Sequence, residues 1–337
     1  MKTDHELTYK QVSIIIPVYN AEKTLPHCIE SLYAQTYRHL ELIFINDCSV
    51  DQSVAVISEQ IAMSANGIEI KSKILHHEVN RGVAAARNTG LDAATGDYIY
   101  YVDADDWIEA DAVEQLIHEA QQKDADIVGL EWHLAFEKNE RYMKQAAFET
   151  PEEALRNLMG GVMRWNLWLF MVRRSLYETN GIRFIEGMNM GEDMMVMIKL
   201  LTCATTVSLL KKPLYHYVQI NVNSLTRTYS QEHIRQVTAN VAEVERYIAN
   251  SRWADQLKTN IHFLKLNIKL PLLITDDKTR YKQWSEWFPE SNLYVMQNNL
   301  LPLRTRLLQW MAAKRWWIFI KCYYRVFIRF IYGVVYR

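Results

Sequence analysis

Short, mostly apolar runs alternate with longer stretches between residues 12 and 132, and this alternation limits the fold more than any other feature. The runs are "VSIIIPVY" (12–19), "LELIFIN" (40–46), "EIKSKILHH" (69–77), "DYIYYVD" (97–103) and "ADIVGLEW" (125–132). The stretches between them include amphipathic segments and one rich in small residues, "GVAAARNTGLDAATG". Strands that alternate with helices predict an α/β fold, with a Rossmann-like mixed sheet flanked by helices.

The second half of the chain is mostly helical by its periodicity. Apolar residues recur every three to four positions in two sets, which are Ile234, Val237, Val241, Val244 and Ile248, then Trp253, Leu257, Ile261, Leu264 and Ile268. This spacing places each set on one helical face. We therefore expect two amphipathic helices packed face to face, and a helical C-terminal region.

Charge is distributed unevenly along the chain. The whole sequence has 38 basic and 39 acidic residues, a formal net charge of −1 that indicates no partner and no nucleic acid. Residues 301–337 contain no Asp or Glu, whereas Lys or Arg occupies positions 304, 306, 314, 315, 321, 325, 329 and 337. This C-terminal tail is therefore expected to meet an anionic surface.

The cysteines and the N-terminus indicate the compartment. The four cysteines are far apart and form no CxxC pair, which argues against a disulfide framework or a zinc site. The first residues, "MKTDHELTYKQ", have no apolar signal core, and no stretch reaches about 18 uncharged apolar residues. A cytoplasmic protein without a spanning helix is expected.

Polar clusters follow three of the expected strands. They are "PVYNAE" after the first strand, "NDCSVD" after the second and "DADD" after the fourth. Ligands of open α/β sheets bind beyond the carboxyl ends of the strands, so the three clusters together predict a binding crevice. Asp47 taken alone could equally cap a turn. Neither GxGxxG after the first strand nor GxxxxGK[ST] is present, so a bound phosphate needs another neutralising device.

The segment "YYVDADDW" places Asp103, Asp105 and Asp106 within four positions. Carboxylates this close raise one another's pKa values unless a cation lies among them. Mg²⁺ and Mn²⁺ prefer such oxygen ligands. The sequence therefore predicts a divalent metal held by Asp105, with Asp103 nearby, that neutralises a diphosphate.

Two long motifs carry a resemblance to a known family. They are "PVYNAEKTLPHCIESLYAQTYRHLELIFINDCSVDQS" and "NRGVAAARNTGLDAATGDYIYYVDADD". In both, the chain resembles the family 2 glycosyltransferases, whose nucleotide-sugar domain has the GT-A fold. The match is specific over residues 12–107 and continues more loosely, through "GEDMMVMIKLL", to about residue 228.

The resemblance implies a donor site made of Pro17, Tyr19, Asn20, Glu22, Asp47, Arg87, Asn88, Asp103 and Ala104. Asp47 would accept the uracil N–H, which suits a carboxylate at a strand end. Arg87 and Asn88 would shape the base and ribose pocket, and an exposed helix arginine is the alternative for Arg87. The family's usual DDGS reads "NDCS" here, with the second acidic position kept.

The resemblance also implies the catalytic base and a further metal ligand. In "MGEDMM" the base falls on Asp193, with Glu192 as the second choice, because a positioned carboxylate can deprotonate an acceptor hydroxyl. The alternative is that Glu192 and Asp193 lie at a solvated helix N-terminus and only stabilise the helix dipole. His216 in "LYHYVQ" would close over the metal or diphosphate, or would be an ordinary buried or surface histidine. The arginine common after this motif is replaced by Val218 and Gln219.

We thus expect an inverting, metal-dependent glycosyltransferase that uses Mn²⁺ or Mg²⁺ and a nucleotide-sugar donor, a UDP-sugar, to build a cell-surface glycan on a glycan or lipid-linked acceptor. The catalytic domain would span residues 1–228, with a donor half at 12–107 and an acceptor half at 108–228. A helical region would follow at 229–300, then the tail. A catalytically inactive membrane-peripheral scaffold is the alternative, and a sugar nucleotidyltransferase is less favoured because "PVYNAE" has no Gly- and Lys-rich loop.

Basic and aromatic residues share the C-terminal tail. Lys314, Lys321, Arg325 and Arg329 are seven, four and four positions apart, which places them on one helical face. A helix over 314–332 is expected to lie in the plane of the inner face of the cell membrane, because charge at every fourth position opposes spanning. A C-terminal helix docked on the protein body is the alternative.

Overall fold

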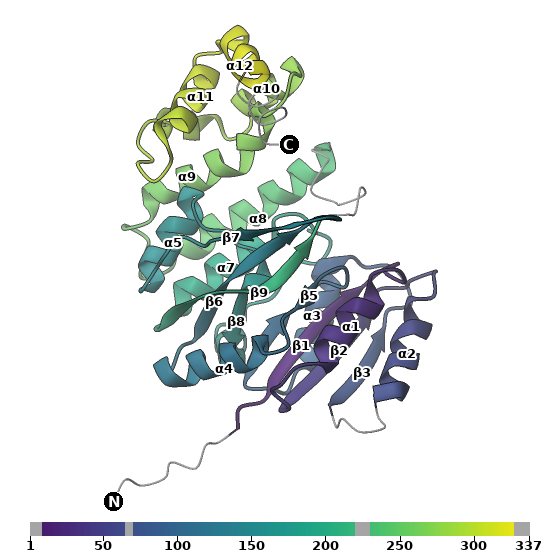
Figure 1. Cartoon of the computed structure of the whole chain (residues 1–337). Coiled ribbons are helices and arrows are strands. Elements are labelled where there is room, and N and C mark those ends of the chain that lie inside the picture. Colours follow the sequence, from purple (N-terminus) through teal and green to yellow (C-terminus); the bar gives the residue numbers. More distant parts are fainter. Residues whose placement is uncertain (1–8, 65–69, 220–229, 327–337) are drawn as a thin grey trace, which may run out of the picture. The chain divides into compact units, whose positions relative to one another are not determined.

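The computed structural model describes residues 9–64, 70–219 and 230–326, and it divides into two compact units (Figure 1). The first unit contains Met1–Pro151 and Trp165–Val244, and the second contains Glu152–Arg164 and Glu245–Arg337. The sequence predicts a separate helical region that begins at residue 229. The first part of that region, up to Val244, belongs to the same unit as the sheet. The short segment 152–164 belongs with the C-terminal helices.

A nine-stranded mixed sheet forms the centre of the first unit. Its strands are β1 (Val12–Val18), β2 (Leu40–Asn46), β3 (Lys71–His76), β4 (Tyr98–Tyr101), β5 (Trp107–Ile108), β6 (Ile127–Ala135), β7 (Glu140–Met143), β8 (Phe170–Arg173) and β9 (Val207–Val218). The order is β3-β2-β1-β4-β8-β6-β9-β5, and β7 pairs with β6. β1 to β4 run parallel, whereas β8 is antiparallel to both β4 and β6. The predicted α/β fold is confirmed.

In the first unit, helices follow most of these strands along the chain (Figure 1). They are α1 (Leu25–Tyr33), α2 (Ser53–Ser64), α3 (Val83–Ala93), α4 (Ala112–Lys123), the short turn η1 (Leu167–Leu169), α6 (Arg174–Thr179), α7 (Glu192–Cys203) and most of α8 (Gln231–Ala249). α3 approaches the sheet closely because Gly90 has no side chain. A Cβ there would lie 2.4 Å from Ile15 Cγ2 and 2.9 Å from Ile45 Cδ1.

The central strands are apolar on both faces, because helices and neighbouring strands cover them and exclude water. Every residue of β2 is buried, and β1 is buried except at Pro17. β9 differs, since Lys211 and Lys212 are exposed and Pro213 cannot donate a ladder hydrogen bond. The β6–β9 register shifts on both sides of Glu131, opposite this segment. The sequence did not predict β5, β7, β8 or β9 as strands.

The second unit is helical. It contains α5 (Pro151–Gly160) beyond its first residue, the end of α8, α9 (Lys258–Lys269), η3 (Leu270–Leu273), α10 (Lys278–Glu286), η4 (Pro289–Tyr294), α11 (Leu303–Ala313) and α12 (Trp317–Tyr323). Its core includes Trp284, Tyr281 and Leu272, all fully buried. The unit therefore has an apolar interior of its own.

The expected single helix over 314–332 is wrong in its first part. α11 ends at Ala313, Arg315 has a left-handed backbone with φ 59°, and α12 begins only at Trp317. Residues 327–332 of the expected helix lie outside the described residues. Within the described parts of the chain, no helix combines the length and the apolar character that crossing a membrane requires.

Candidate active site

The loops after β1 and β2 are joined to each other by hydrogen bonds at the carboxyl ends of the strands. The side chain of Asn20, which has a left-handed backbone (φ 51°), accepts a hydrogen bond from the amide of Val50 at 2.9 Å. Glu22 accepts one from the amide of Gln52 at 3.0 Å. Tyr19 is 53% exposed. Asn20 and Glu22 therefore shape this edge of the sheet, while Tyr19 offers its ring to solvent.

Asp47, at the end of β2, is buried and holds the loop that leads into α3. Its Oδ1 lies 2.6 Å from His77 Nδ1 and accepts a hydrogen bond from the amide of Arg81 at 2.8 Å. Its Oδ2 accepts one from the amide of Gly82 at 2.7 Å. A carboxylate has about four lone-pair sites, so these three contacts leave one for a further donor.

Carboxylates gather after β4, as the sequence predicts. Asp106 is buried, and its side chain accepts hydrogen bonds from Tyr215 Oη at 2.7 Å and from the amide of Val218 at 2.8 Å. Burial, then the charges of Asp105 and Asp103, raises the pKa of Asp106 well above its usual value. Asp106 therefore ties the loop to β9, which leaves Asp103 and Asp105 as the candidate ligand residues.

Arg87, on α3, lies at the centre of a cluster of carboxylates from two other segments. Its side chain is 4% exposed. Nη1 donates to Glu192 at 2.8 Å and also to Asp193, and Nη2 is 3.5 Å from Asp103 Oδ1. The guanidinium carbon also lies 5.7 Å from the ring centre of Phe184. One cation thus joins the end of β4 to the first turn of α7.

The acids of this cluster differ in their readiness to ionise. Burial, then the charge of Asp193, raises the pKa of Glu192 to about 8, although Arg87 acts in the opposite direction. Burial also raises the pKa of Asp103 to about 6; Arg87 lowers it and Asp105 raises it further. At neutral pH Glu192 therefore keeps its proton. Arg87 donates to the side chains of both Glu192 and Asp193.

Arg87 and Asn88, which the resemblance assigns to the base and ribose pocket, contact the chain around the start of α7. The guanidinium of Arg87 lies among the three acids just described rather than on an exposed helix face. The amide of Asn88 is engaged twice with the backbone of Phe184, donating to its carbonyl at 3.0 Å and accepting from its N–H at 2.9 Å. Both residues thus connect α3 to the chain that leads into α7. Pro17, in β1, is partly buried and Ala104 is buried.

His216 lies on β9 with both ring nitrogens near carboxylates. Nδ1 is 2.9 Å from Glu140 Oε1, and Nε2 is 2.9 Å from Glu109 Oε1. Its side chain is 2% exposed and its ring stacks on Trp107, with centroids 3.4 Å apart. His216 is thus buried between two carboxylates, and we leave it out of the donor site.

The donor atoms after β4 fit a hard divalent cation. Asp103 and Asp105 offer carboxylate oxygens, the ligands that Mg²⁺ and Mn²⁺ prefer. The charge of Asp105 raises the pKa values of both Asp103 and Asp106, so the negative charge at this strand end is not fully balanced by Arg87. A cation bound there would relieve this repulsion.

Sequence reasoning missed His77 and Tyr215. His77 is buried and bridges Asp47 and Thr89, whose Oγ1 lies 2.9 Å from Nε2. Tyr215 donates to Asp106 and accepts from the amide of Asp103 at 3.2 Å. A histidine at the end of an expected strand was a usable signal for His77. Tyr215 gave none, because its partners lie 109 and 112 positions away along the chain.

Comparisons with known proteins identify the family. Residues 13–200 match the model of "Glycosyl transferase family 2". EpsH of Bacillus subtilis is 33% identical over 228 residues, which are 66% of this chain and 64% of EpsH. EpsJ of Bacillus subtilis, an uncharacterized glycosyltransferase, is 30% identical over 277 residues, 79% of this chain and 77% of EpsJ.

The fold is also found among solved structures. S. aureus TarS (residues 1–349), solved with UDP-GlcNAc, superimposes with a TM-score of 0.71 at 20% identity, covering 94% of this chain and 91% of that one. This likeness shows the GT-A fold that the sequence motifs imply. Because the family model covers more than half of the chain and EpsJ matches most of its length, the chain belongs to family 2 of the glycosyltransferases.

Proposed function

We propose that this glycosyltransferase is inverting and metal-dependent and transfers a sugar from a UDP-sugar to a glycan or lipid-linked acceptor in cell-surface polysaccharide synthesis. Its relative TarS was solved with UDP-GlcNAc, which supports a uridine donor. The lone-pair site that remains on Asp47 suits the N–H of a uracil ring. Tyr19, which is exposed and directly precedes Asn20 in the chain, supplies a ring face for the uracil base.

The Arg87 cluster is the observation that carries this proposal. Asp103 belongs to the strand end where the donor diphosphate is expected, and Asp193 is the expected base. Arg87 brings the two together, although they lie 90 residues apart in sequence. A transferase needs its leaving-group site and its base on either side of one reacting carbon, and this cluster supplies both.

In the proposed reaction the acceptor hydroxyl attacks the anomeric carbon. Its oxygen forms a bond to that carbon as the bond to the donor phosphate oxygen breaks, and the nucleoside diphosphate leaves with the bonding electrons. Asp193 takes the hydroxyl proton. Glu192, protonated at neutral pH, cannot compete for that role and places no second charge beside the base. One displacement of this kind inverts the anomeric centre.

Asp105, with Asp103, would hold the divalent ion. When bound there, Mn²⁺ or Mg²⁺ supplies positive charge that stabilises the departing diphosphate. Arg87 contacts Asp103 and keeps its carboxylate in place. The hydrogen bonds of Asp106 to Tyr215 and Val218 of β9 fix the loop that carries Asp103 and Asp105. These residues are therefore arranged before the donor arrives, as electrostatic catalysis requires.

The second unit offers a surface for a membrane-bound acceptor. Between α11 and α12 and in the first turn of α12, five side chains are exposed: Lys314, Arg315, Trp316, Ile318 and Phe319. Aromatic and aliphatic side chains beside basic ones favour the interface of an anionic leaflet. We propose that these five residues, the 314–319 surface, bind the inner face of the cell membrane. Lys321 and Arg325 are excluded because both pair with Asp276, at 3.2 and 3.0 Å.

A donor screen tests the proposed function. Nucleotide sugars are added to the purified protein with Mn²⁺, and thermal shift and slow hydrolysis of the donor are measured. We expect one or more UDP-sugars to raise Tm and to release UDP, and EDTA to remove the hydrolysis. Full hydrolysis in EDTA would contradict metal dependence, and no response to any donor would favour an inactive scaffold.

A further inference from the structure

A row of three stacked rings crosses β5, β9 and β6 of the sheet. His133 on β6 and His216 on β9 are direct partners in the parallel register, and His216 is also the partner of Trp107 on β5. The two imidazole rings stack with centroids 4.8 Å apart and planes at 19°. Side chains at paired positions of neighbouring strands lie on the same face of a sheet, so the pairing of His133 with His216 brings the two imidazoles close together.

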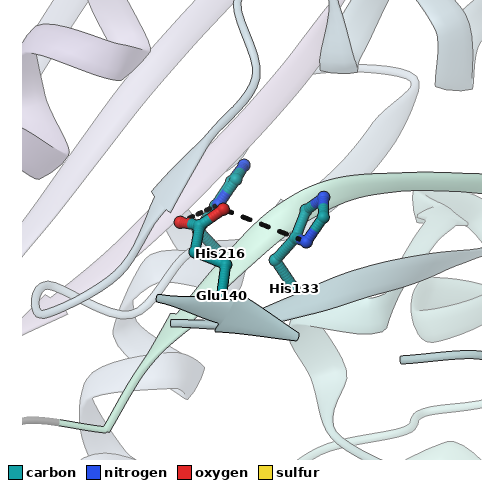
Figure 2. Close-up of side chains that lie close together, drawn as sticks. All are labelled: His133, Glu140 and His216. Carbon is teal, nitrogen blue, oxygen red and sulfur yellow. Dashed lines mark hydrogen bonds and ion pairs between the residues drawn. The ribbon is translucent and has the colours of Figure 1, made fainter. Parts of the chain in front are cut away.

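Glu140 on β7 completes a cluster with these histidines, as Figure 2 shows. Its Oε1 lies 2.9 Å from His216 Nδ1, and its Oε2 lies 3.9 Å from His133 Nδ1. The three candidate ligand atoms all lie within 4.8 Å of one another. The side chain of Glu140 is 39% exposed, so an ion could reach the cluster from solvent.

The contacts of His216 leave one position electrostatically unbalanced. A neutral imidazole has one N–H donor and one lone pair, yet both nitrogens of His216 face carboxylate oxygens at 2.9 Å. If Nε2–H donates to Glu109, the lone pair on Nδ1 points at the anionic oxygen of Glu140. A cation between Nδ1 and Glu140 removes this repulsion, and a second proton on the ring is the other remedy.

The ring of His133 also has an unsatisfied nitrogen. Its Nδ1 is buried and has no hydrogen-bond partner. The nearby Glu140 Oε2, at 3.9 Å, is beyond hydrogen-bond range. A buried polar atom without a partner is rare in proteins and calls for a ligand or a specific cause. This atom faces the same carboxylate that faces His216 (Figure 2).

We propose that His133, Glu140 and His216 form a binding site for a divalent transition-metal ion of the zinc type. Two imidazoles and one carboxylate are a ligand set that such ions prefer, whereas the all-oxygen Asp103 and Asp105 suit Mg²⁺ or Mn²⁺. Glu109 accepts the Nε2–H of His216 and so orients the ring toward the ion, as carboxylates behind metal-bound histidines do. Zn–N bonds of about 2.0–2.1 Å require the two rings to tilt toward each other.

The site would join three strands. β7 pairs only with β6 in the sheet order, and Glu140 would attach it to β9 through the ion. β9 also carries Tyr215, whose hydroxyl holds Asp106. The ion would therefore stabilise the strand next to the proposed donor site without contacting the reacting groups. This inference does not depend on the proposed function.

Metal titration of the full chain tests the site. The protein is stripped with a chelator and titrated with Zn²⁺ by calorimetry and with Co²⁺ by visible absorption, in wild type and in Asp105→Ala. We expect one Zn²⁺ per chain in both proteins and Co²⁺ bands typical of a low-coordinate site with nitrogen ligands. His133→Asn and Glu140→Gln should each weaken binding by more than about tenfold, and Glu109→Gln by about 10- to 100-fold.

His118→Asn, which changes an exposed histidine on α4, is the matched control and should bind as the wild type does. Zn²⁺ should also raise the Tm of the wild type and of His118→Asn, but not that of Glu140→Gln, whose exposed position makes misfolding a poor explanation. Absence of Zn²⁺ binding, or full binding by His133→Asn or Glu140→Gln, would overturn the proposal.

Discussion

Each compact unit contains a buried cation, and the two cations have opposite surroundings. Arg87, in the first unit, is 4% exposed and is bound by carboxylates from two segments far away in sequence. Lys269, in the second unit, is fully buried and donates to neutral oxygens: the carbonyls of Trp287 and Phe288 at 2.7 and 3.1 Å, and Asn292 Oδ1 at 2.6 Å. The ammonium also lies 4.3 Å from the Trp284 ring centre.

From this difference we infer a structural role for Lys269 and propose a functional one for Arg87. Three neutral oxygens satisfy the three N–H groups of Lys269, and all three belong to the short segment 287–292, which the lysine thereby fixes. Around Arg87 one positive charge faces three acids, so the cluster stays rich in negative charge and its acids have shifted pKa values.

The largest effect is expected for Arg87→Met. Removing the cation leaves Asp103, Glu192 and Asp193 together without compensation, which typically costs about 3–5 kcal/mol of unfolding free energy. Loss of a preorganised charge should also lower kcat by at least about 10²-fold. Chemical denaturation and donor hydrolysis measure the two effects. Wild-type turnover in a folded Arg87→Met protein would show that the cluster is only structural.

Lys269→Met should affect stability alone. Its three acceptor oxygens lose their donor, while the methionine stem keeps most of the packing, so a loss of about 1–3 kcal/mol is expected. Hydrolysis of the donor by the folded variant should match the wild type. A large fall in kcat at unchanged stability would break the comparison, because the second cation would then take part in catalysis.

The pH dependence of stability should have opposite signs at the two sites. Burial raises the pKa of Glu192 to about 8, so the folded state holds an extra proton, and stability from this group falls as pH rises from about 4.5 to 8. Burial lowers the pKa of Lys269 to about 7, so its contribution rises from about pH 7 to 10.5. Denaturation across pH should lose the falling component in Glu192→Gln and the rising one in Lys269→Met.

The smallest effect concerns the 314–319 surface. Leu308, Ala312 and Ile320 are buried, so truncating the tail would open the core of the second unit, and surface substitutions are the better test. Trp316→Ser with Phe319→Ser should reduce flotation with anionic liposomes severalfold and leave donor hydrolysis unchanged. Met63→Ser, at an exposed position of the first unit, is the control. Equal flotation of all three proteins would exclude this surface as the membrane contact.

Much of the sheet could be predicted because its central strands have local signatures. β1 and β2 are nearly continuous apolar runs, and the structure places them within one residue of the expected bounds. β9 could not be predicted, since Lys211, Lys212 and Pro213 interrupt its pattern and its pairing with β6 supplies the missing stabilisation. The break in the tail helix at Arg315 likewise has no local signal in the sequence. After the break, Ile320 is buried, and Lys321 and Arg325 pair with Asp276.

The candidate site shows the same division. The acidic cluster after the fourth expected strand indicated Asp103 and Asp105, and the family resemblance of short motifs indicated Asp47 and Asp193. The Arg87 cluster could not be derived, because its partners Glu192 and Asp193 lie 105 and 106 positions away. A local pattern contains no information on such contacts. Only the fold brings α3 and α7 together around one guanidinium.

Asp193→Asn tests the central claim most directly, that the Arg87 cluster holds the base of a glycosyl transfer. Single-turnover rate and donor affinity are measured for the wild type and the variant with the UDP-sugar that the donor screen identifies. We expect a rate lower by about 10²- to 10⁴-fold with donor affinity nearly unchanged, since a base acts chiefly in the transition state. A variant that loses donor affinity and keeps its rate would contradict it, and would place Asp193 in the donor site.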